Sequence, residues 1–144
     1  MNFVRRALAA LGAVVALGGG LVAFSSSPAS AYDATPCLAP YWHSGVARYV
    51  QTCPDWGMSG TNDIPVYNIN ASPPAIVGWI DAAGNDWYVC QKQVTQYDPY
   101  AYAGYYNDWF AYTLADNGKW GWAPEVFFQG GDNMEPDRKL AMCS

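Results

Sequence analysis

Aromatic side chains are the residues of this sequence with the clearest capacity for chemistry. The chain has 7 Trp, 11 Tyr and 5 Phe among 144 residues, and a small domain buries only some of them because each ring needs a large apolar surrounding. Rigid exposed rings bind peptides or glycans and lose little conformational entropy in doing so. The surplus rings fall in one Pro- and Gly-containing loop and beside the hairpin that follows it. We predict that these rings bind a ligand: Tyr97, Tyr100, Tyr102, Tyr105, Tyr106, Trp109 and Trp120.

The same tyrosines also have a structural interpretation, in which they fold back as a lid over a small core. A barrel needs aromatic residues inside in any case, and seven others suit the core or its margin. They are Tyr67, Trp79, Trp87, Tyr88, Phe110, Trp122 and Phe127.

Catalytic chemistry has weak support in the sequence. His43 is the only histidine, no G-x-S-x-G motif accompanies it, and a catalytic Ser–His–Asp set needs an oriented pair. Most of the acids lie in turns, where Asp supports local backbone hydrogen bonds. We expect no catalytic residue, although carboxylates from distant loops leave glycoside hydrolysis open.

Metal binding has one weak candidate. Asp132, Asn133, Glu135 and Asp137 form an acidic cluster that could hold calcium, but their spacing differs from that of an EF-hand loop. The cysteines lack the closely spaced pairs of a zinc site. We expect a solvated acidic loop, no metal site and no cofactor.

The 4 cysteines indicate two disulfide bonds, because an even count in a small exported chain is typical of a disulfide framework. Three pairings are possible, and the sequence alone does not choose among them. We favour Cys37–Cys53, which closes a segment rich in turn residues, and Cys90–Cys143, which ties the C-terminal tail to a strand.

The first 31 residues have the order of a cleaved secretory signal. Basic Arg5 and Arg6 precede an apolar stretch over residues 7–24, and the small-residue site Ala29-Ser30-Ala31 follows. Three glycines at 18–20 argue against a retained membrane helix. We predict a signal peptide over residues 1–31 and a secreted mature protein outside the membrane, with the twin-arginine route left open.

The mature chain is acidic. The signal takes two of the 7 Lys and Arg residues, so five remain against 12 Asp and Glu, a net charge of −7. This charge excludes nucleic acid, which needs clustered cations. We expect a monomer whose partner is a peptide, peptidoglycan or another secreted protein.

From residue 63 onward, β-type stretches alternate with turns about every ten residues, which is typical of a small barrel or sandwich. Asn117-Gly118 is the strongest hairpin signal, since both residues tolerate positive φ. Residues 32–62 contain many Pro and Gly, so we predict an irregular extension there and a barrel domain over residues 63–144. Strands are expected at 64–69, 75–80, 87–94, 109–114 and 119–123.

Three motifs in the barrel region carry a family resemblance: Ile76-Val77-Gly78-Trp79-Ile80, Trp109-Phe110-Ala111-Tyr112, and the run from Asn117-Gly118 through Gly121-Trp122 to Phe128. With these motifs, residues 66–128 resemble the bacterial SH3-type (SH3b-like) domains of secreted, cell-wall-associated proteins. The tail, with Gly130-Gly131-Asp132-Asn133 and Cys143, is similar to that of stand-alone SH3-like proteins exported by actinobacteria.

The resemblance implies an all-β, SH3-like barrel of five to six strands, with a binding groove between the tyrosine-rich loop and a 3₁₀ turn near Pro124. The function it implies is that of a secreted, non-catalytic module that recognises a peptide or a cell-wall component through an aromatic face. The alternative is a secreted inhibitor of an extracellular enzyme such as a protease, because a small disulfide-bonded scaffold limits the ordering cost of a binding loop.

Overall fold

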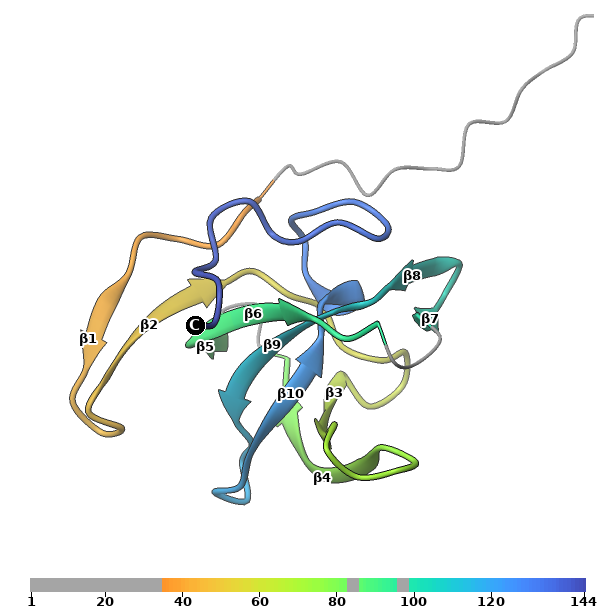
Figure 1. Ribbon diagram of the computed structural model, residues 1–144, viewed down its shortest axis with the longest axis horizontal. Coiled ribbons are helices and arrows are strands. Elements are labelled where there is room, and N and C mark those ends of the chain that lie inside the picture. Colours follow the sequence, from red (N-terminus) through yellow and green to blue (C-terminus); the bar gives the residue numbers. More distant parts are fainter. Residues whose placement is uncertain (1–34, 83–85, 96–98) are drawn as a thin grey trace, which may run out of the picture.

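The computed structural model describes residues 35–82, 86–95 and 99–144 (Figure 1). The predicted signal peptide over residues 1–31 therefore lies outside the described residues. The described chain is all-β, as predicted. Its elements, in chain order, are β1 (Tyr41–His43), β2 (Arg48–Cys53), β3 (Asp63–Asn68), β4 (Ala75–Asp81), β5 (Asp86–Tyr88), β6 (Cys90–Gln93), β7 (Tyr100–Tyr102), β8 (Tyr105–Asn107), β9 (Trp109–Leu114), β10 (Trp120–Pro124) and the 3₁₀ helix η1 (Glu125–Phe127).

The strands form three sheets, so the prediction of a closed barrel is wrong. The main sheet has the order β4-β3-β10-β9-β6, a second has the order β1-β2-β5, and β7 pairs with β8. The stretch predicted as one strand at 87–94 divides at Val89. Its first half, β5, pairs with β2, and its second half, β6, pairs with β9. Neither half pairs with β4, so the described strands of the main sheet do not close into a barrel, and Met142 forms a bridge with Gln91 at the β6 edge.

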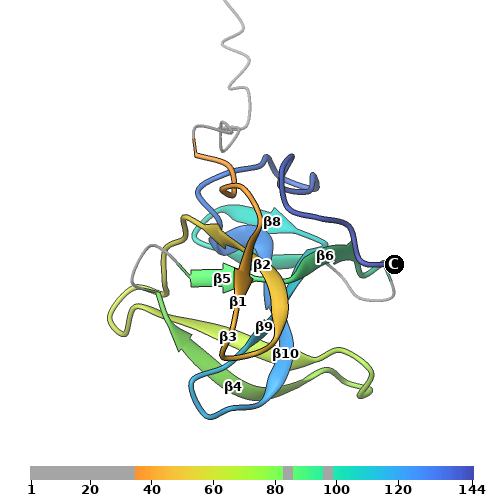
Figure 2. The same ribbon diagram turned by 90° about the vertical axis from the view of Figure 1, so that its left-hand side faces the viewer.

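The N-terminal segment is more regular than predicted. β1 and β2 form an antiparallel hairpin, which runs along one side of the molecule in Figure 1 and faces the viewer in Figure 2. The Pro and Gly residues lie around this hairpin, while β2 itself gains a partner in β5. Long-range pairing of this kind leaves no trace in local composition.

The predicted hairpin at Asn117-Gly118 is confirmed. β9 and β10 pair antiparallel from Trp120↔Leu114 to Pro124↔Phe110, and Gly118 has a φ of 78°. The side chain of Asn117 fixes the turn, because its Oδ1 accepts from the Lys119 N–H and its Nδ2 donates to the carbonyl of Val77 on β4.

The core lies against the inner face of the main sheet. Tyr88 and Phe127 are fully buried in it, and the small Ala111 and Ala123 on β9 and β10 leave room for these rings. Burial of Tyr88, Phe110 and Phe127 confirms their assignment to the interior. Trp79 on β4 is 40% exposed, and its assignment to the core is wrong.

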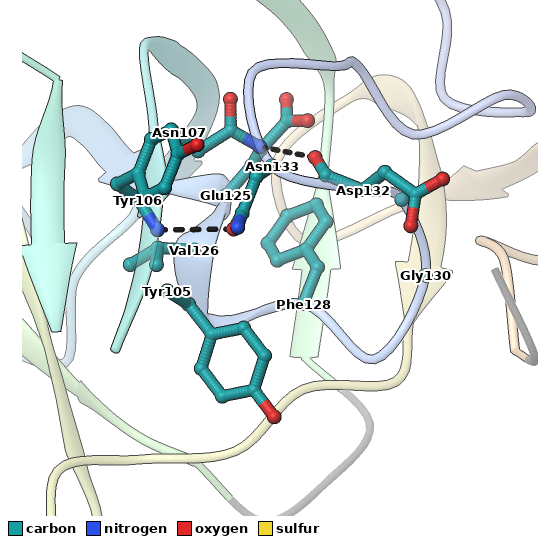
Figure 3. A pocket seen from close by; sticks show the side chains of 10 residues that line it. Tyr105, Tyr106, Asn107, Glu125, Val126, Phe128, Gly130, Asp132 and Asn133 are labelled. Atoms are coloured by element: carbon teal, nitrogen blue, oxygen red, sulfur yellow. Dashed lines mark hydrogen bonds between the residues drawn. The ribbon is translucent and has the colours of Figure 1, made fainter. Parts of the chain in front are cut away.

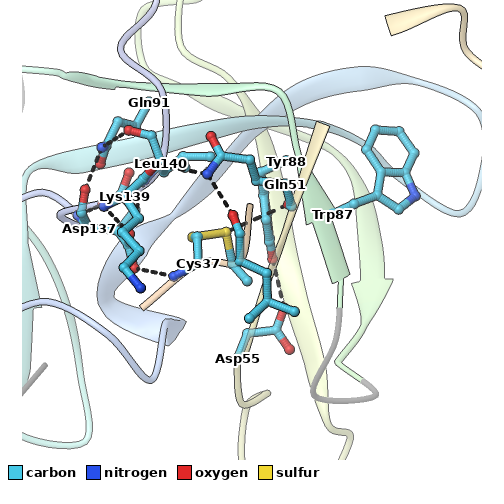
Figure 4. The surroundings of a disulfide bond; sticks show 12 residues. Cys37, Gln51, Asp55, Trp87, Tyr88, Gln91, Asp137, Lys139 and Leu140 are labelled. Atoms are coloured by element: carbon cyan, nitrogen blue, oxygen red, sulfur yellow. Dashed lines mark hydrogen bonds between the residues drawn. A yellow bond between two sulfur atoms is a disulfide. The ribbon is translucent and has the colours of Figure 1, made fainter. Parts of the chain in front are cut away.

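Both disulfides have the favoured pairing, Cys37–Cys53 and Cys90–Cys143. Buried amides hold the same regions together (Figure 4): the Gln51 side chain donates to the carbonyls of Leu38 and Lys139, and the Gln91 side chain donates to those of Asp137 and Leu140. The tail is therefore an integral part of the fold.

Two disulfides suggest an oxidising, extracellular environment for the protein. In the described ranges, no helix has the length and apolar character needed to span a membrane.

Candidate ligand-binding site

Three large rings stand side by side on the outer face of the main sheet. Tyr112 on β9 lies directly opposite Trp122 on β10, and Trp120 lies two residues before Trp122 on the same face. The Tyr112 ring centroid is 5.1 Å from that of Trp120, with the ring planes 22° apart, and 5.0 Å from that of Trp122. We call Tyr112, Trp120 and Trp122 the aromatic row.

The alternation of large and small residues explains why the rings share this face. Ala111, Thr113, Gly121 and Ala123 alternate with the row residues and are buried on the inner face. A Cβ atom at Gly121 would lie 2.6 Å from Cγ1 of Val66, so this position accepts no larger side chain without movement. The core thus selects small residues, and the large rings face outward.

Cations and further rings extend the row. The guanidinium carbon of Arg48 lies 5.2 Å from the Trp120 ring centroid, and Nζ of Lys92 lies 4.2 Å from that of Trp122. Trp87 contacts Trp120 at 5.9 Å between centroids. Cation–π contacts of this length stabilise a ring by about 0.5–1 kcal/mol at an exposed site, which holds the indoles in place.

Two hollows flank the Tyr112–Trp122 pair. One, of ≈ 300 Å³, lies toward β3 between the row and the side chains of Tyr67, Asn68 and Asn70. The other, of ≈ 400 Å³, lies toward Arg48 and the C-terminal residues Met142 and Ser144. Each volume is at the lower end of the range for small-ligand sites, and the aromatic pair forms a ridge between them.

The tyrosine-rich loop is largely folded back, in contrast to the exposed surface that was predicted. Tyr100, Tyr102 and Tyr105 are half-buried on the β7–β8 hairpin and pack against the core. The ring centroids of Tyr100 and Tyr102 lie 5.8 and 5.3 Å from that of Phe127. Tyr102 also accepts a hydrogen bond from the Ser59 N–H at 2.6 Å. The structural interpretation, a lid over the core, therefore applies to these three residues.

The other predicted binding residues are scattered. Tyr106 is 40% exposed, whereas Pro124 is fully buried and has no surface for a ligand. Trp109 is half-buried at the start of β9, on the opposite face of the strand from Tyr112. Tyr97 lies outside the described residues. Of the predicted set, only Trp120 belongs to the aromatic row.

Sequence reasoning missed Tyr112. It assigned Trp122 to the core or its margin, where Trp122 is half-buried and packs against Ile69, Val94 and Phe110, but it did not predict a place for Trp122 in the row. The signal that would have found both is the alternation itself. Large and small residues alternate in Phe110-Ala111-Tyr112-Thr113 and Trp120-Gly121-Trp122-Ala123. Because successive side chains of a strand point to opposite faces, this alternation places the rings together on one face of each strand.

A second cluster surrounds the carboxyl group of Glu125 (Figure 3). A small cavity of ≈ 10 Å³, about the size of one water molecule, is lined by Glu125, Asn107, Asp132 and Asn133 among others. The pKa of Glu125 is raised to about 8, chiefly by burial; a hydrogen bond from the Asp137 backbone N–H lowers it and the charge of Asp137 raises it. Glu125 is therefore largely protonated at neutral pH.

The acidic tail cluster is engaged in structure. The carboxylate of Asp137 accepts hydrogen bonds from the backbone N–H groups of Cys37, Lys139 and Leu140. Its oxygens thus organise the tail. Across the described ranges, no group of three or more His, Cys, Asp or Glu side chains has the arrangement of a metal site.

A third cluster joins β2 to β5. The Tyr88 hydroxyl donates to Oδ2 of the buried Asp55 at 2.9 Å. Burial, and then the neighbouring Asp55, raises the pKa of Asp86 to about 7. His43 lies nearby on β1, with its ring 4.9 Å from that of Trp87. Its Nδ1 is buried and has no hydrogen-bond partner among the described residues.

Comparison of the chain with protein-family models, with curated proteins and with solved structures finds no match. The aromatic row and the sequence resemblance are therefore the features that point to a function.

Proposed function

We propose that this protein is a secreted, non-catalytic, SH3-like binding module that takes an extended, proline-containing peptide across its aromatic row. The observation that carries the proposal is the ridge of Tyr112 and Trp122 between two hollows. The Tyr112 ring is stacked on that of Trp120 and borders both hollows, so a ligand meets a ridge between hollows rather than a flat ring face.

A polyproline II segment fits such a surface for three reasons. It is preformed, so binding orders little chain. Its pyrrolidine rings fill hollows between aromatic side chains. Its carbonyls lack internal hydrogen bonds and meet the donors that an indole N–H and a phenol hydroxyl supply at the ring edges. Sugars, by contrast, are expected to stack on open ring faces, and here Trp120 is contacted by both Tyr112 and Arg48.

The test is a titration of the protein with a ten-residue proline peptide, followed by calorimetry and tryptophan fluorescence. Trp122→Ala and Tyr112→Ala should each weaken binding by tenfold or more, as expected for central aromatic residues of an interface. Trp79→Ala is the matched control, because Trp79 is 40% exposed on β4 and lies outside both hollows. The affinity of the Trp79→Ala protein for the proline peptide should equal that of the wild type.

Two results would contradict the proposal. Equal losses in Trp79→Ala and Trp122→Ala would show that the row has no special role. If the protein binds purified peptidoglycan and does not bind the proline peptide, the ligand of the aromatic row is the wall component and not a peptide.

A further inference from the structure

The two ends of the aromatic row each carry a cation. Arg48 lies over Trp120 and Lys92 over Trp122, with Tyr112 between the two indoles. The chain has only 7 Lys and Arg residues against 12 Asp and Glu. Two of these scarce cations therefore lie on one small face.

Neither cation has an ion-pair partner among the described residues. Among the described residues, the Arg48 guanidinium and the Lys92 ammonium have no carboxylate oxygen within 4.0 Å. A cation that rests on a ring keeps N–H donors directed away from it. Within the part of the chain that the structure describes, both cations are therefore available to a ligand.

We propose that the peptide bound by this site is acidic, with one carboxylate near each end of its proline-containing segment. Arg48 binds one carboxylate and Lys92 binds the other. This inference rests on the proposed function, and it names the chemistry of the partner.

The stacking distances limit the spacing of the two carboxylates. Successive steps along the row measure 5.2, 5.1, 5.0 and 4.2 Å from Arg48 to Lys92, which places the two cations less than ~20 Å apart. A polyproline II chain rises ~3.1 Å per residue. The carboxylates are therefore separated by at most about six residues.

The net charge of the molecule separates long-range electrostatics from the effect of the two local cations. A net charge of −5 for the full chain repels an acidic peptide at long range. Any preference for acidic over neutral peptide must therefore come from local cations, and simple net-charge attraction would give the opposite order.

The experiment compares three blocked peptides: Ala-Pro-Pro-Ala-Pro-Pro-Ala, and the same sequence with both terminal residues changed to Asp or to Lys. The Asp peptide should bind about tenfold more tightly than the neutral one, and the Lys peptide more weakly. Arg48→Gln and Lys92→Gln should each reduce the ratio of Asp-peptide to neutral-peptide affinity about threefold. Lys119→Gln, which removes one exposed charge from the β9–β10 turn, should leave that ratio unchanged.

The outcomes separate the two proposals. If the neutral peptide binds and the Asp peptide binds no better, the acidic-partner inference is wrong and the proposed function stands. An equal fall of the ratio in Lys119→Gln would also overturn it. If none of the peptides binds, the proposed function fails, and this inference fails with it.

Discussion

At the scale of single residues, Glu125 has the most unusual environment. It is 3% exposed, and its Oε2 accepts a hydrogen bond from the Asp137 N–H, while Oε1 has no partner in the described part of the chain. Desolvation is the largest cause of its raised pKa, because a buried carboxylate loses the hydration that stabilises its charge. The folded state therefore binds a proton that the unfolded chain releases.

This protonation gives stability a specific dependence on pH. The folded-state pKa of Glu125, about 8, lies above its ordinary value of 4.5. The contribution of Glu125 is complete below pH 4.5 and is lost as the pH rises to about 8. The pKa of Asp86 is raised from 3.8 to about 7 by burial and by Asp55, so Asp86 also makes the folded state less stable as the pH rises. Urea denaturation should give a larger free energy of unfolding at pH ~5 than at pH ~8.5.

Glu125→Gln should remove most of this dependence. The amide keeps an acceptor for the Asp137 N–H but does not titrate, so the difference in unfolding free energy between the two pH values should shrink by on the order of 3–4 kcal/mol. Asp63→Asn, at a half-buried position on β3, serves as the control substitution. A Glu125→Gln protein with the same pH dependence as the wild type would show that Glu125 is ionised in the folded protein.

At the scale of elements, the β7–β8 hairpin changes role between sequence and structure. Its tyrosines were expected to be exposed because the loop contains Pro and Gly, yet the hairpin lies over η1 and the indole of Trp56. Tyr102 and Tyr105 approach the Trp56 ring at 5.6 and 6.0 Å between centroids. The hairpin is an outer wall of the core.

Removal of these rings should therefore unfold the protein more readily. Combined substitution of Tyr100, Tyr102 and Tyr105 by Ala should cost roughly 4 kcal/mol or more, since each half-buried ring loses part of the 3–5 kcal/mol of a fully buried one. Tyr102→Phe alone should cost about 1 kcal/mol, the value of its hydrogen bond from Ser59. Tyr49→Ala, at a tyrosine that is 66% exposed, should change little. A triple variant as stable as the wild type in urea would contradict this assignment.

The predictable elements are those whose signals are local. The β9–β10 hairpin follows from Asn117-Gly118 and the aromatic runs beside it, and β3 and β4 fall within a residue or two of their predicted ranges. The division of 87–94 into β5 and β6 was not predictable, because it depends on β2, which lies some 35 residues earlier. The aromatic row itself was partly predictable, since its alternation with small residues is visible in the sequence.

At the scale of the whole molecule, the larger core cluster and the aromatic row lie on different faces of the main sheet. The inner face packs against Tyr88, Phe127 and the Cys37–Cys53 disulfide. The outer face holds the row, fixed by stacking and by two cations. Trp122 also packs against a smaller core cluster of Ile69, Val94 and Phe110. Among the described residues, Tyr112 and Trp120 belong to neither core cluster, so substitution of Tyr112 is the cleaner mutational test of the binding proposal.

The most direct test of the central claim is a two-dimensional NMR titration of the indole N–H signals of the 7 tryptophans with the ten-residue proline peptide. Binding across the aromatic row should give large, saturable shifts for Trp120 and Trp122, and none for Trp79 on β4 or for Trp56 beneath the β7–β8 hairpin. Shifts confined to Trp56 or Trp79, with Trp120 and Trp122 unmoved, would contradict it.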